Sequence, residues 1–245
     1  LAPNTAGISS FLGSMRPFSF DSPSQFRPGP PPSLHSRRWA RAYNETRILG
    51  SSTSEALPGG PARAAVARFW SDPPVVQNQR GLRDFSERHG LGALRTARLF
   101  ALADTASADA LIACFDAKYH YEFWRPATAI PGGETDGNRR TPGDAGWHPL
   151  LPVTPNHPEY PSAHSCSTTA IAVVVAALDH GRLDLDLTST TTGATRHFSS
   201  VDQLVGEVAN ARVWGGLHWR FSTDAGERIG RQVAAEVIGG QCQRR

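Results

Sequence analysis

The spacing of apolar residues is helical over most of the chain. Apolar side chains recur every three or four positions in several segments, as expected when one face of a helix is buried. Glycine and proline clusters separate these segments, because neither residue favours the interior of a helix. The predicted helices span residues 33–49, 62–71, 75–89, 91–124, 162–178, 201–213 and 222–238.

Other stretches depart from this helical pattern. Residues 1–32 are rich in Pro, Ser, Gly and Phe, so we predict an extended arm that packs over the domain. Residues 131–161 have little periodicity and predict a long loop, and loops of such length are often functional. The segment 184–197 fits a loop or a short strand. The pattern leaves undecided whether the predicted helix 91–124 is interrupted around residues 105–108. Four aromatic side chains are expected to anchor the arm: Phe11, Phe18, Phe20 and Phe26.

The predicted fold is all-α, a single-domain helical bundle with an extended, proline-rich N-terminal arm. No repeat period is visible, and no linker divides the chain after residue 33. We therefore assign the arm to residues 1–32 and the helical-bundle domain to residues 33–245. Hydrophobic content of 39% and charged content of 19% are typical of a globular protein and exclude a disordered one.

The charge of the chain favours a local anion site over a polyanionic partner. The formal net charge is +3, and arginine supplies nearly all the positive charge, because Lys118 is the single lysine. Nucleic-acid-binding proteins concentrate basic residues in a stripe or tail. No such concentration is present here, so we expect no nucleic-acid partner.

Cysteine usage and hydropathy bear on compartment and membrane association. Cys114, Cys166 and Cys242 are too few for a disulfide scaffold and lack metal-ligand spacing, so one disulfide or a fully reduced chain are both open. The longest apolar run, residues 170–178, is far shorter than the ~20 residues that span a bilayer, so no membrane-integral protein is expected. The chain begins at Leu1 rather than Met. We expect a secreted or periplasmic location in preference to a cytoplasmic one.

The first candidate cluster for chemistry is Lys118-x6-Arg125-Pro126. Side chains seven residues apart lie two turns apart on one face of a helix. A lysine and an arginine in this arrangement could converge on one anion. Taken alone, a solvated basic face is the simpler explanation.

The second candidate cluster is Pro161-Ser162-Ala163-His164, just before an apolar run. At a helix N-terminus the unpaired amides and the macrodipole favour an anion. Ser162 adds a hydroxyl donor, and His164, with a pKa near neutrality by default, could transfer a proton. Taken alone, a capping serine beside a surface histidine explains the motif.

The third candidate cluster is Arg212-x5-His218. These side chains would not share a face of one continuous helix, but the pair Gly215-Gly216 predicts a break that lets both turn inward. A neutral imidazole at position 218 could attack phosphorus or coordinate a metal-centred oxyanion. Taken alone, a helix end followed by an incidental histidine is sufficient.

Together the three clusters resemble the signature of the vanadium-dependent haloperoxidases and the related type-2 phosphatidic acid phosphatase superfamily. The family pattern is Lys-x6-Arg-Pro, then Pro-Ser-Gly-His, then Ser-Arg-x5-His-x3-Asp. All three blocks occur in this order with matching internal spacing, across residues 118–222. The resemblance is to soluble, bacterial-type members similar to vanadium chloroperoxidase, and the family's helical bundle agrees with the predicted helices.

The resemblance implies a role for each residue of the clusters. Ser162 and the amide of Ala163 would donate hydrogen bonds to a bound vanadate or phosphate. His218 would be the axial vanadium ligand of a haloperoxidase or the phosphorylated nucleophile of a phosphatase, and His164 would be the acid–base residue. Three basic side chains would neutralise the oxygens of the anion: Lys118, Arg125 and Arg212.

Three positions depart from the family pattern. Ala163 replaces the glycine, which keeps the amide but adds a methyl group, and Ala211 replaces the serine before the arginine. Ser222 stands where many members have an aspartate that orients the histidine, so the resemblance predicts a less firmly held His218. Asp224 could substitute only if the following helix began at a shifted position.

The shared pocket leaves three functions open. We expect a vanadate-dependent haloperoxidase that oxidises halide with hydrogen peroxide and serves small-molecule organic acceptors. The alternatives are a soluble acid-phosphatase-type phosphohydrolase, which uses His218 on phosphoesters without a cofactor, and a non-catalytic anion-binding helical protein. A mere binder would need neither His164 nor His218, which argues against the last alternative.

A halide or substrate pocket is predicted beside the basic cluster. His157, five residues before the motif serine, resembles the bromoperoxidase pattern, and Phe115 and Trp124 could supply an apolar wall. Ordinary packing explains these three residues equally well.

Overall fold

The structure, a computed structural model, describes residues 7–242, with side chains described through residue 240. It is mostly helical, as the sequence predicts. A small hairpin of two strands is the exception. The helices are α1 (Arg37–Leu49), α2 (Gly60–Phe69), α3 (Pro74–Arg88), α4 (Ala93–Tyr121), α5 (Pro126–Ala129), α6 (Ala163–Leu178), α7 (Val201–Trp214) and α8 (Arg220–Cys242); the strands are β1 (Leu185–Thr188) and β2 (Thr195–Phe198). Four short 3-10 turns complete the elements: η1 (Ser10–Ser14), η2 (Pro23–Phe26), η3 (Ser54–Ala56) and η4 (Gly133–Asp136).

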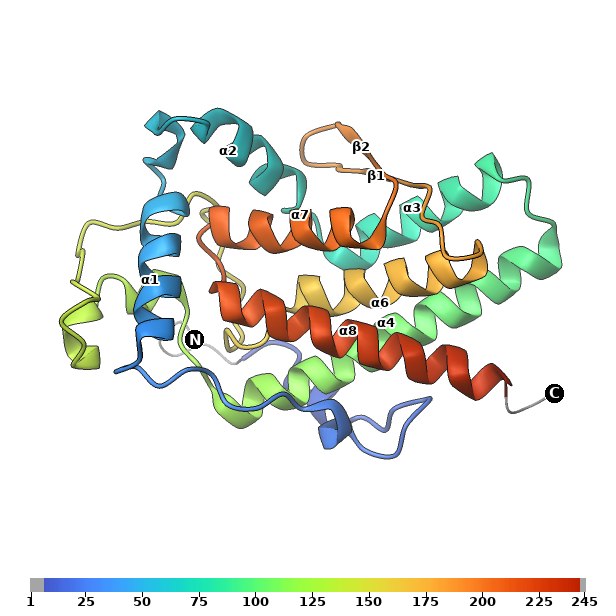
Figure 1. The fold of residues 1–245 in the computed structure, drawn as a ribbon, viewed down its shortest axis with the longest axis horizontal. Helices are drawn as coiled ribbons and strands as arrows, with labels where there is room; N and C mark the ends of the chain where they lie inside the picture. The colour runs from blue at the N-terminus through green and yellow to red at the C-terminus, as the bar shows by residue number, and fades with distance from the viewer. Residues whose placement is uncertain (1–6, 243–245) are drawn as a thin grey trace.

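Helix α6 is the centre of the bundle, between α4 and α8, with α7 packed beside it (Figure 1). Most side chains of α6 are buried, which explains why its apolar residues are not confined to one stripe and why its polar residues are small Ser and Thr side chains. Helix α8 approaches the start of α6 closely at Gly226, where an added Cβ would lie 2.6 Å from the carbonyl oxygen of Ser162. The N-terminus of α6 is therefore held against α8.

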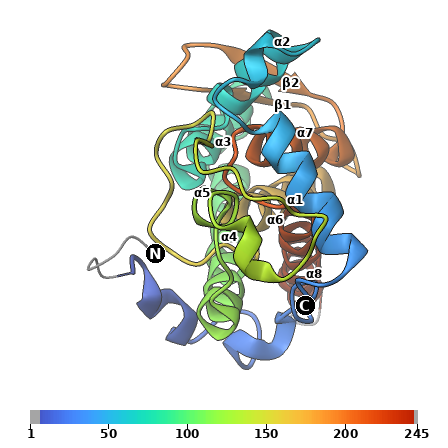
Figure 2. The same ribbon diagram turned by 90° about the vertical axis from the view of Figure 1, so that its left-hand side faces the viewer.

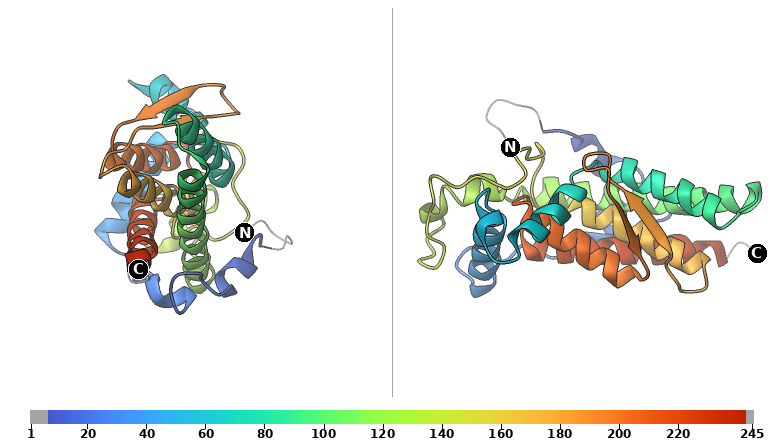
Figure 3. Two further views of the ribbon diagram at one scale, coloured as in Figure 1. Left: turned by 90° about the vertical axis from the view of Figure 1, so that its right-hand side faces the viewer. Right: turned by 90° about the horizontal axis from the view of Figure 1, so that it is seen from above.

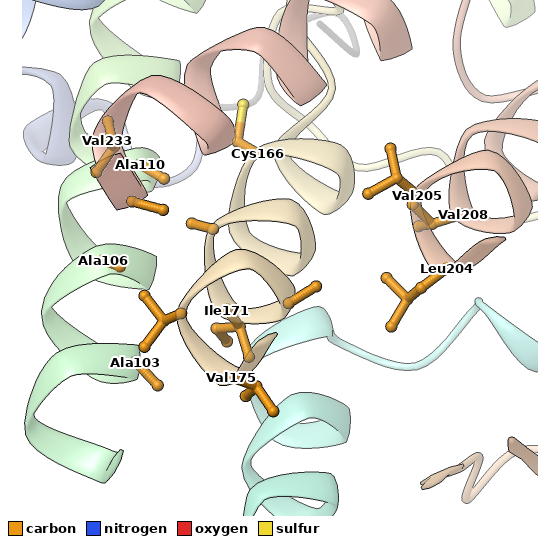
Figure 4. Packing of buried hydrophobic residues seen from close by; sticks show 14 of the residues in the cluster. Ala103, Ala106, Ala110, Cys166, Ile171, Val175, Leu204, Val205, Val208 and Val233 are labelled. Carbon is orange, nitrogen blue, oxygen red and sulfur yellow. The ribbon is translucent and has the colours of Figure 1, made fainter. Parts of the chain in front are cut away.

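Small side chains on α4 allow α6 to pack closely against it. Ala103, Ala106 and Ala110 face the bundle interior, where they meet larger residues of α6 such as Ile171 and Val175 (Figure 4). Alternating small and large residues across such a contact fills the core to the density of protein interiors. This packing fixes the last turn of α4 relative to the first turn of α6.

One end of the bundle is closed by α1 and the long loop at 131–161 (Figure 2). Trp39 of α1 lies in a cluster of aromatic rings with Tyr43 and Trp219, and all three are fully buried. The indole nitrogen of Trp39 donates to Asp136 at 2.7 Å, and the Tyr43 hydroxyl donates to the carbonyl of Pro142 at 2.9 Å. These hydrogen bonds tie the loop to the bundle, so the predicted loop is ordered by buried contacts.

The structure differs from the predicted helix 91–124 at its end and decides the two segments that the sequence left undecided. Helix α4 runs without a break through residues 105–108, and it ends at Tyr121 rather than at Trp124. Glu122 ends it in the left-handed conformation, with φ of 46°. The segment at 184–197 forms the antiparallel hairpin β1–β2, and β1 packs against α3 (Figure 3).

The N-terminal arm packs along α4 with only part of the anchoring that its aromatic residues predict. Phe20 is buried and meets Phe26 edge-on, with ring centroids 4.9 Å apart. Phe11 and Phe18 are exposed, so their predicted role as anchors is wrong. A partly buried ion pair also anchors the arm, because the guanidinium of Arg27 donates two hydrogen bonds to the Asp116 carboxylate of α4, at 2.6 and 2.7 Å.

Within residues 7–242, no helix is long and apolar enough to cross a membrane. Cys114 and Cys166 are buried free thiols, which excludes a disulfide between these two in this structure. The side chain of Cys242 lies outside the described residues.

Candidate oxyanion-binding site

Three cationic side chains from separate segments are buried at the end of the bundle where α6 begins. Lys118 comes from the last turn of α4, Arg125 from the segment before α5, and Arg212 from the last turn of α7. Long cationic side chains are almost never fully buried without a partner, because removing a charge from water costs much free energy. Their burial therefore marks this region as the candidate site.

Lys118 connects α4 to the long loop. Its Nζ atom donates to the carbonyl oxygens of Pro158 and Glu159, at 2.8 and 3.0 Å. Burial lowers the pKa of Lys118 to about 8, although the neighbouring thiol of Cys114 acts in the opposite direction. The ammonium group thus has backbone dipoles as partners and no carboxylate within hydrogen-bond distance among the described residues.

Arg125 connects three parts of the site. The sequence predicts that it shares a helical face with Lys118, and this prediction is wrong. The residue before a proline is disfavoured in the helical region, and Arg125 is extended, with ψ of 155°. Its Nε atom donates to the carbonyl of His157 at 3.1 Å, and Nη1 donates to the carbonyl of Leu217 at 2.9 Å. Burial lowers the pKa of Arg125 to about 10.

Arg212 reaches the same region from α7. Its Nη1 atom donates to the carbonyl oxygen of Trp70 at 2.6 Å, and its Nε atom is buried with no acceptor among the described residues. Burial, followed by repulsion from Arg125, lowers the pKa of Arg212 to about 9. This guanidinium therefore retains unused hydrogen-bonding capacity inside the protein.

His218 lies in the short connection between α7 and α8, and the predicted helix break is confirmed. Helix α7 ends at Trp214, and Gly216 adopts a left-handed φ of 73°. Any Cβ at position 216 would also collide with the carbonyl oxygen of Gly50, so this position requires glycine on both counts. The turn brings His218 back toward the cations.

The hydrogen bonds of His218 determine which ring nitrogen carries the proton. Nε2 lies 3.2 Å from Nη1 of Arg125, and a guanidinium can only donate, so Nε2 is the acceptor. Nδ1 lies 2.8 Å from Oε1 of Glu159 and therefore carries the hydrogen. Burial, and then the charge of Arg125, lowers the pKa of His218 well below its usual value, so the ring is neutral.

Glu159 is a member of the site that the sequence motifs do not include. Its carboxyl group is fully buried, and Oε1 also accepts from the backbone N–H of Trp219 at 3.0 Å. Oε2 is buried with no partner among the described residues, and burial raises the pKa of Glu159 to about 7. The signal that could have identified it is an acidic residue in the functional loop, two positions before the motif proline.

Neither Ser222 nor Asp224 holds the ring of His218, which corrects the expectation drawn from the family pattern. The Ser222 hydroxyl is at 3.4 Å from the carbonyl oxygen of Glu159, to which it donates. Asp224 lines a separate shallow groove beside Arg220. Because Glu159 contacts Nδ1, the ring is held by a carboxylate from the loop instead of from α8.

The N-terminus of α6 contributes backbone donors. The Ser162 hydroxyl accepts from the N–H of Ser165 at 3.4 Å, which leaves its own hydrogen free to donate. The amides of Ala163 and His164, in the first turn, have no backbone acceptor within the part of the chain that the structure describes. Ala163 and His164 both line the cavity described below.

His164 differs from expectation in its charge. Its Nε2 atom lies 3.1 Å from the carbonyl oxygen of Asp72, so Nε2 carries the hydrogen and Nδ1 carries the lone pair. Burial, and then the charge of Arg212, lowers the pKa of His164 well below the neutral range that the sequence suggests. In this structure the ring of His164 is therefore neutral, with its lone pair on Nδ1.

The Asp72 carboxylate connects the site to the turn of the β1–β2 hairpin. It accepts from the backbone N–H groups of Thr190 and Thr191, at 2.6 and 3.0 Å, and from both of their hydroxyls. Burial alone would raise the pKa of Asp72, but these hydrogen bonds outweigh it and lower the pKa to about 2. The segment at 70–72, which offers carbonyls to Arg212 and His164, is thereby fixed in place.

A cavity of about 890 Å³ opens onto these residues. His157, His164, Arg212 and His218 of the candidate site are among its polar lining residues. Phe115 lies in its wall, with its ring centroid 5.1 Å from that of His157, as the sequence predicts for a pocket.

Trp124 lies elsewhere, which corrects its predicted place in this pocket. It is absent from the described lining of the cavity and stacks on Trp39 of the aromatic cluster, with ring centroids 6.1 Å apart. The reason is the end of α4 at Tyr121: the chain turns before position 124 instead of continuing as a helix.

The charges at the site fit a multiply charged oxyanion. Among the described residues, none of the three buried cations forms an ion pair with a carboxylate. The Glu159 carboxyl group acts on Lys118 and Arg125 only through its charge, and its raised pKa reduces even that compensation. The rings of His164 and His218 are neutral, and Nε of Arg212 has no acceptor among the described residues. A vanadate or phosphate would neutralise the excess positive charge and accept the unused donors.

Three known proteins and one protein family resemble this chain. Residues 98–241 match the family model described as the VCPO second helical-bundle domain. The vanadium chloroperoxidase of Curvularia inaequalis is 29% identical over 180 residues, which cover 54% of this chain and 29% of that protein.

Two solved structures resemble this fold. The crystal structure of the first bacterial vanadium-dependent iodoperoxidase superimposes with a TM-score of 0.80 and 26% identity, over 96% of this chain and 58% of that chain. A holo-type bacterial vanadium-dependent chloroperoxidase superimposes with a TM-score of 0.73 and 20% identity, over 96% and 55% respectively, which shows the shared fold. This chain therefore spans less than two thirds of the length of each of these relatives.

Proposed function

Because this chain belongs to the family of the VCPO second helical-bundle domain, we propose that it is a vanadate-dependent haloperoxidase, which uses hydrogen peroxide to oxidise halide. The observation that carries this proposal is the buried, under-compensated group of Lys118, Arg125 and Arg212 around a neutral His218. The similarity to the vanadium chloroperoxidase and to the bacterial iodoperoxidase supports the choice of reaction.

Each residue has a task that follows from its contacts. The three cations would hold the oxygens of vanadate, together with the Ser162 hydroxyl and the amide of Ala163. His218 would present the lone pair of Nε2, because Glu159 keeps the hydrogen on Nδ1. When bound, vanadate supplies the activation of peroxide for a two-electron oxidation.

His164 would move the proton in this reaction. Its Nε2–H is engaged by the carbonyl of Asp72, which leaves Nδ1 as the basic atom of a side chain that lines the cavity. A neutral imidazole can take a proton from an incoming peroxide and return it to a leaving hydroxide. A bound anion would also raise the pKa of His164, because it would offset the charge of Arg212 that now lowers it.

A soluble phosphohydrolase is the second candidate function, and the contact between Glu159 and His218 is compatible with it. The family pattern, with Ser222 in place of the aspartate, predicts a less firmly held ring, which would handicap a phosphatase. Instead, a buried carboxylate contacts Nδ1 at 2.8 Å and orients Nε2 as a nucleophile would require. This geometry would serve either chemistry.

A side-by-side assay distinguishes these functions. The purified chain, loaded with vanadate, is tested with peroxide and bromide; the vanadate-free chain is tested with a chromogenic phosphomonoester. We expect vanadate-dependent bromide oxidation that is lost in His218→Ala. Phosphomonoester hydrolysis alone, again lost in His218→Ala, would establish the second candidate. Anion binding without either activity would identify a non-catalytic binding protein.

A further inference from the structure

Most of the side chains that wall the cavity at the candidate site are apolar. They come from separate segments: Ile8 and Leu12 of the arm, Val75 at the start of α3, Leu111 of α4, and Leu150 to Val153 of the long loop. Four segments that are distant in sequence thus contribute the same kind of surface. Such convergence is typical of a ligand pocket, where apolar walls bury the ligand and a few polar groups orient it.

The mouth of the cavity keeps apolar side chains in contact with solvent. Val153, Ile8 and Val75 are 78%, 50% and 44% exposed, although all three line the cavity. Contiguous exposed apolar residues commonly mark a ligand-binding or interaction site. The apolar surface therefore extends from the polar group at the base of the cavity to the solvent.

The walls carry no free charge. No carboxylate occurs among the described lining residues, and Arg68 is the only charged side chain there besides Arg212. Arg68 forms two hydrogen bonds to Glu55, at 2.9 and 2.7 Å, so its charge is already compensated. His157 is neutral, since burial lowers its pKa to about 2. Nothing on the walls would recognise a second charged group on a ligand.

The size of the cavity exceeds what the small reactants need. Its volume is about 890 Å³, near the upper end of the range for pockets that hold drug-sized ligands. A water molecule occupies ~30 Å³ of the liquid, and peroxide or a halide ion is of similar size. Halide and peroxide alone would leave most of this apolar space to disordered water.

We propose that the cavity binds a neutral, apolar, electron-rich organic acceptor, which is halogenated while it is held beside His164 and His218. The inference rests on the proposed function for its chemistry. In the overall reaction R–H + X⁻ + H₂O₂ + H⁺ gives R–X + 2 H₂O. Peroxide is reduced to water, halide is oxidised by two electrons, and a C–H bond of the acceptor is replaced by C–X. Because the acceptor lies against the site, the oxidised halogen reacts before it escapes.

Binding is tested first, without halide, peroxide or vanadate. 2-Naphthol serves as the probe, because it is neutral, apolar, electron-rich and fluorescent. Its affinity is measured by calorimetry and by fluorescence in the wild type and in Val75→Asp/Val153→Asp. We expect the double variant to bind 2-naphthol at least about tenfold more weakly, because two carboxylates then stand in the apolar mouth. Both substitutions are at exposed positions, so folding should be retained.

The matched control is Val76→Asp/Leu94→Asp. Val76 is the neighbour of Val75 in α3 and is equally exposed, at 45%, and Leu94 is 84% exposed; neither lines the cavity. The control adds the same two charges, so it should bind 2-naphthol as the wild type does. Equal weakening in both double variants would overturn the proposed location.

Vanadate binding distinguishes an error in the acceptor site from an error in the proposed haloperoxidase function. Vanadate affinity is measured for all three proteins, and we expect it to be the same, since no residue of the cationic group is altered. Vanadate binding without any 2-naphthol binding by the wild type would overturn the acceptor site and leave the haloperoxidase intact. A concentration-dependent dimer that the Val75→Asp/Val153→Asp substitutions abolish would also overturn it, because a second copy would then cover the mouth.

The products give an independent measurement. The ratio of brominated 2-naphthol isomers made by the loaded wild type is compared with the ratio made by hypobromite in solution. We expect the enzymatic ratio to differ, and the Val75→Asp/Val153→Asp variant to approach the solution ratio. An enzymatic ratio identical to that of free hypobromite would show that halogenation occurs outside the cavity.

Discussion

His218 and Glu159 form a buried hydrogen bond that orients the ring of His218 in the candidate site, with Nδ1 of the histidine 2.8 Å from Oε1 of the glutamate. The partner of the histidine comes from the loop before α6, whereas the family pattern places an aspartate after the histidine. The same Oε1 accepts from the N–H of Trp219, so the carboxylate fixes the ring and the start of α8 together.

Removing the charge of Glu159 should impair the site more than any change at Ser222. We expect Glu159→Gln to lower kcat by about 10- to 100-fold, as is usual when the partner of a metal-binding histidine is changed. Ser222→Ala should have little effect, because its hydroxyl reaches only a carbonyl at 3.4 Å. Steady-state kinetics of both variants decide this, and a larger loss in Ser222→Ala would return the orienting role to position 222.

Binding of an oxyanion should stabilise the fold through the buried cations. At a phosphate or vanadate concentration of one hundred times Kd, linkage adds about 2.7 kcal/mol to the free energy of unfolding. Arg212→Ala should lose most of this gain. Arg139→Ala, which removes the same charge from an exposed position, should keep it. Thermal unfolding with and without anion measures the effect, and equal gains in the two variants would mean that the anion binds elsewhere.

Substitution of His164 should separate binding from turnover. We expect His164→Ala to retain vanadate affinity, because the cations and amides remain, and to lower kcat on the order of 10²–10⁴-fold. Calorimetric vanadate binding and bromide oxidation are measured on the same preparation. Normal turnover by this variant would assign proton transfer to another group.

The hairpin turn should influence His164 from a distance. Thr190→Val/Thr191→Val removes two hydroxyl donors from the Asp72 carboxylate and should loosen the segment whose carbonyl engages Nε2. We expect a lower kcat, unchanged vanadate affinity, and ¹⁵N chemical shifts that report a mixture of His164 tautomers.

A control in the same hairpin separates this effect from general loosening. The hydroxyls of Thr188 and Thr195 form a hydrogen bond at 2.8 Å to each other and have none to Asp72. Thr188→Val/Thr195→Val should therefore leave the His164 spectrum unchanged. A tautomer mixture in this control would refute transmission through Asp72.

Acid should destabilise the protein through His157. Burial lowers its pKa in the folded chain from 6.5 to about 2. Between these values the unfolded chain binds a proton that the folded chain does not, so stability is full above pH 6.5 and falls as the pH decreases toward 2. The free energy of unfolding is measured with denaturant at several pH values between 2 and 6.5. We expect its slope against pH to be smaller in His157→Gln, by the equivalent of up to one bound proton. An unchanged slope would show that His157 is protonated in the folded state.

Local periodicity was sufficient to predict the bundle, and short-range motifs were sufficient to collect the cationic residues and both histidines. The end of α4 was predicted three residues too late, because Phe123 and Trp124 continue the apolar spacing while Glu122 has already left the helix. Apolar spacing does not reveal which residue adopts a left-handed conformation. The same apolar spacing predicts a helical face shared by Lys118 and Arg125, whereas Arg125 lies beyond the end of α4 in an extended conformation.

The contacts that complete the site lie beyond such motifs. Glu159 is an ordinary acidic residue in a loop until the fold brings it against His218, 59 positions later. The carbonyls of Trp70 and Asp72 have no side-chain signature at all, since every residue carries the same carbonyl group. Only the tertiary packing of α2, α6 and α7 places them beside Arg212 and His164.

The burial of Lys118 leaves the surface of the protein without a lysine side chain, because the chain contains no other. Acylating reagents, and oxidants that convert amines to haloamines, would find no side-chain amine on the folded molecule apart from what the α-amino group offers. The reaction of Lys118 with an amine-directed label would therefore report the rate at which the interior opens. The residue that helps to hold the anion is also a native probe of that opening.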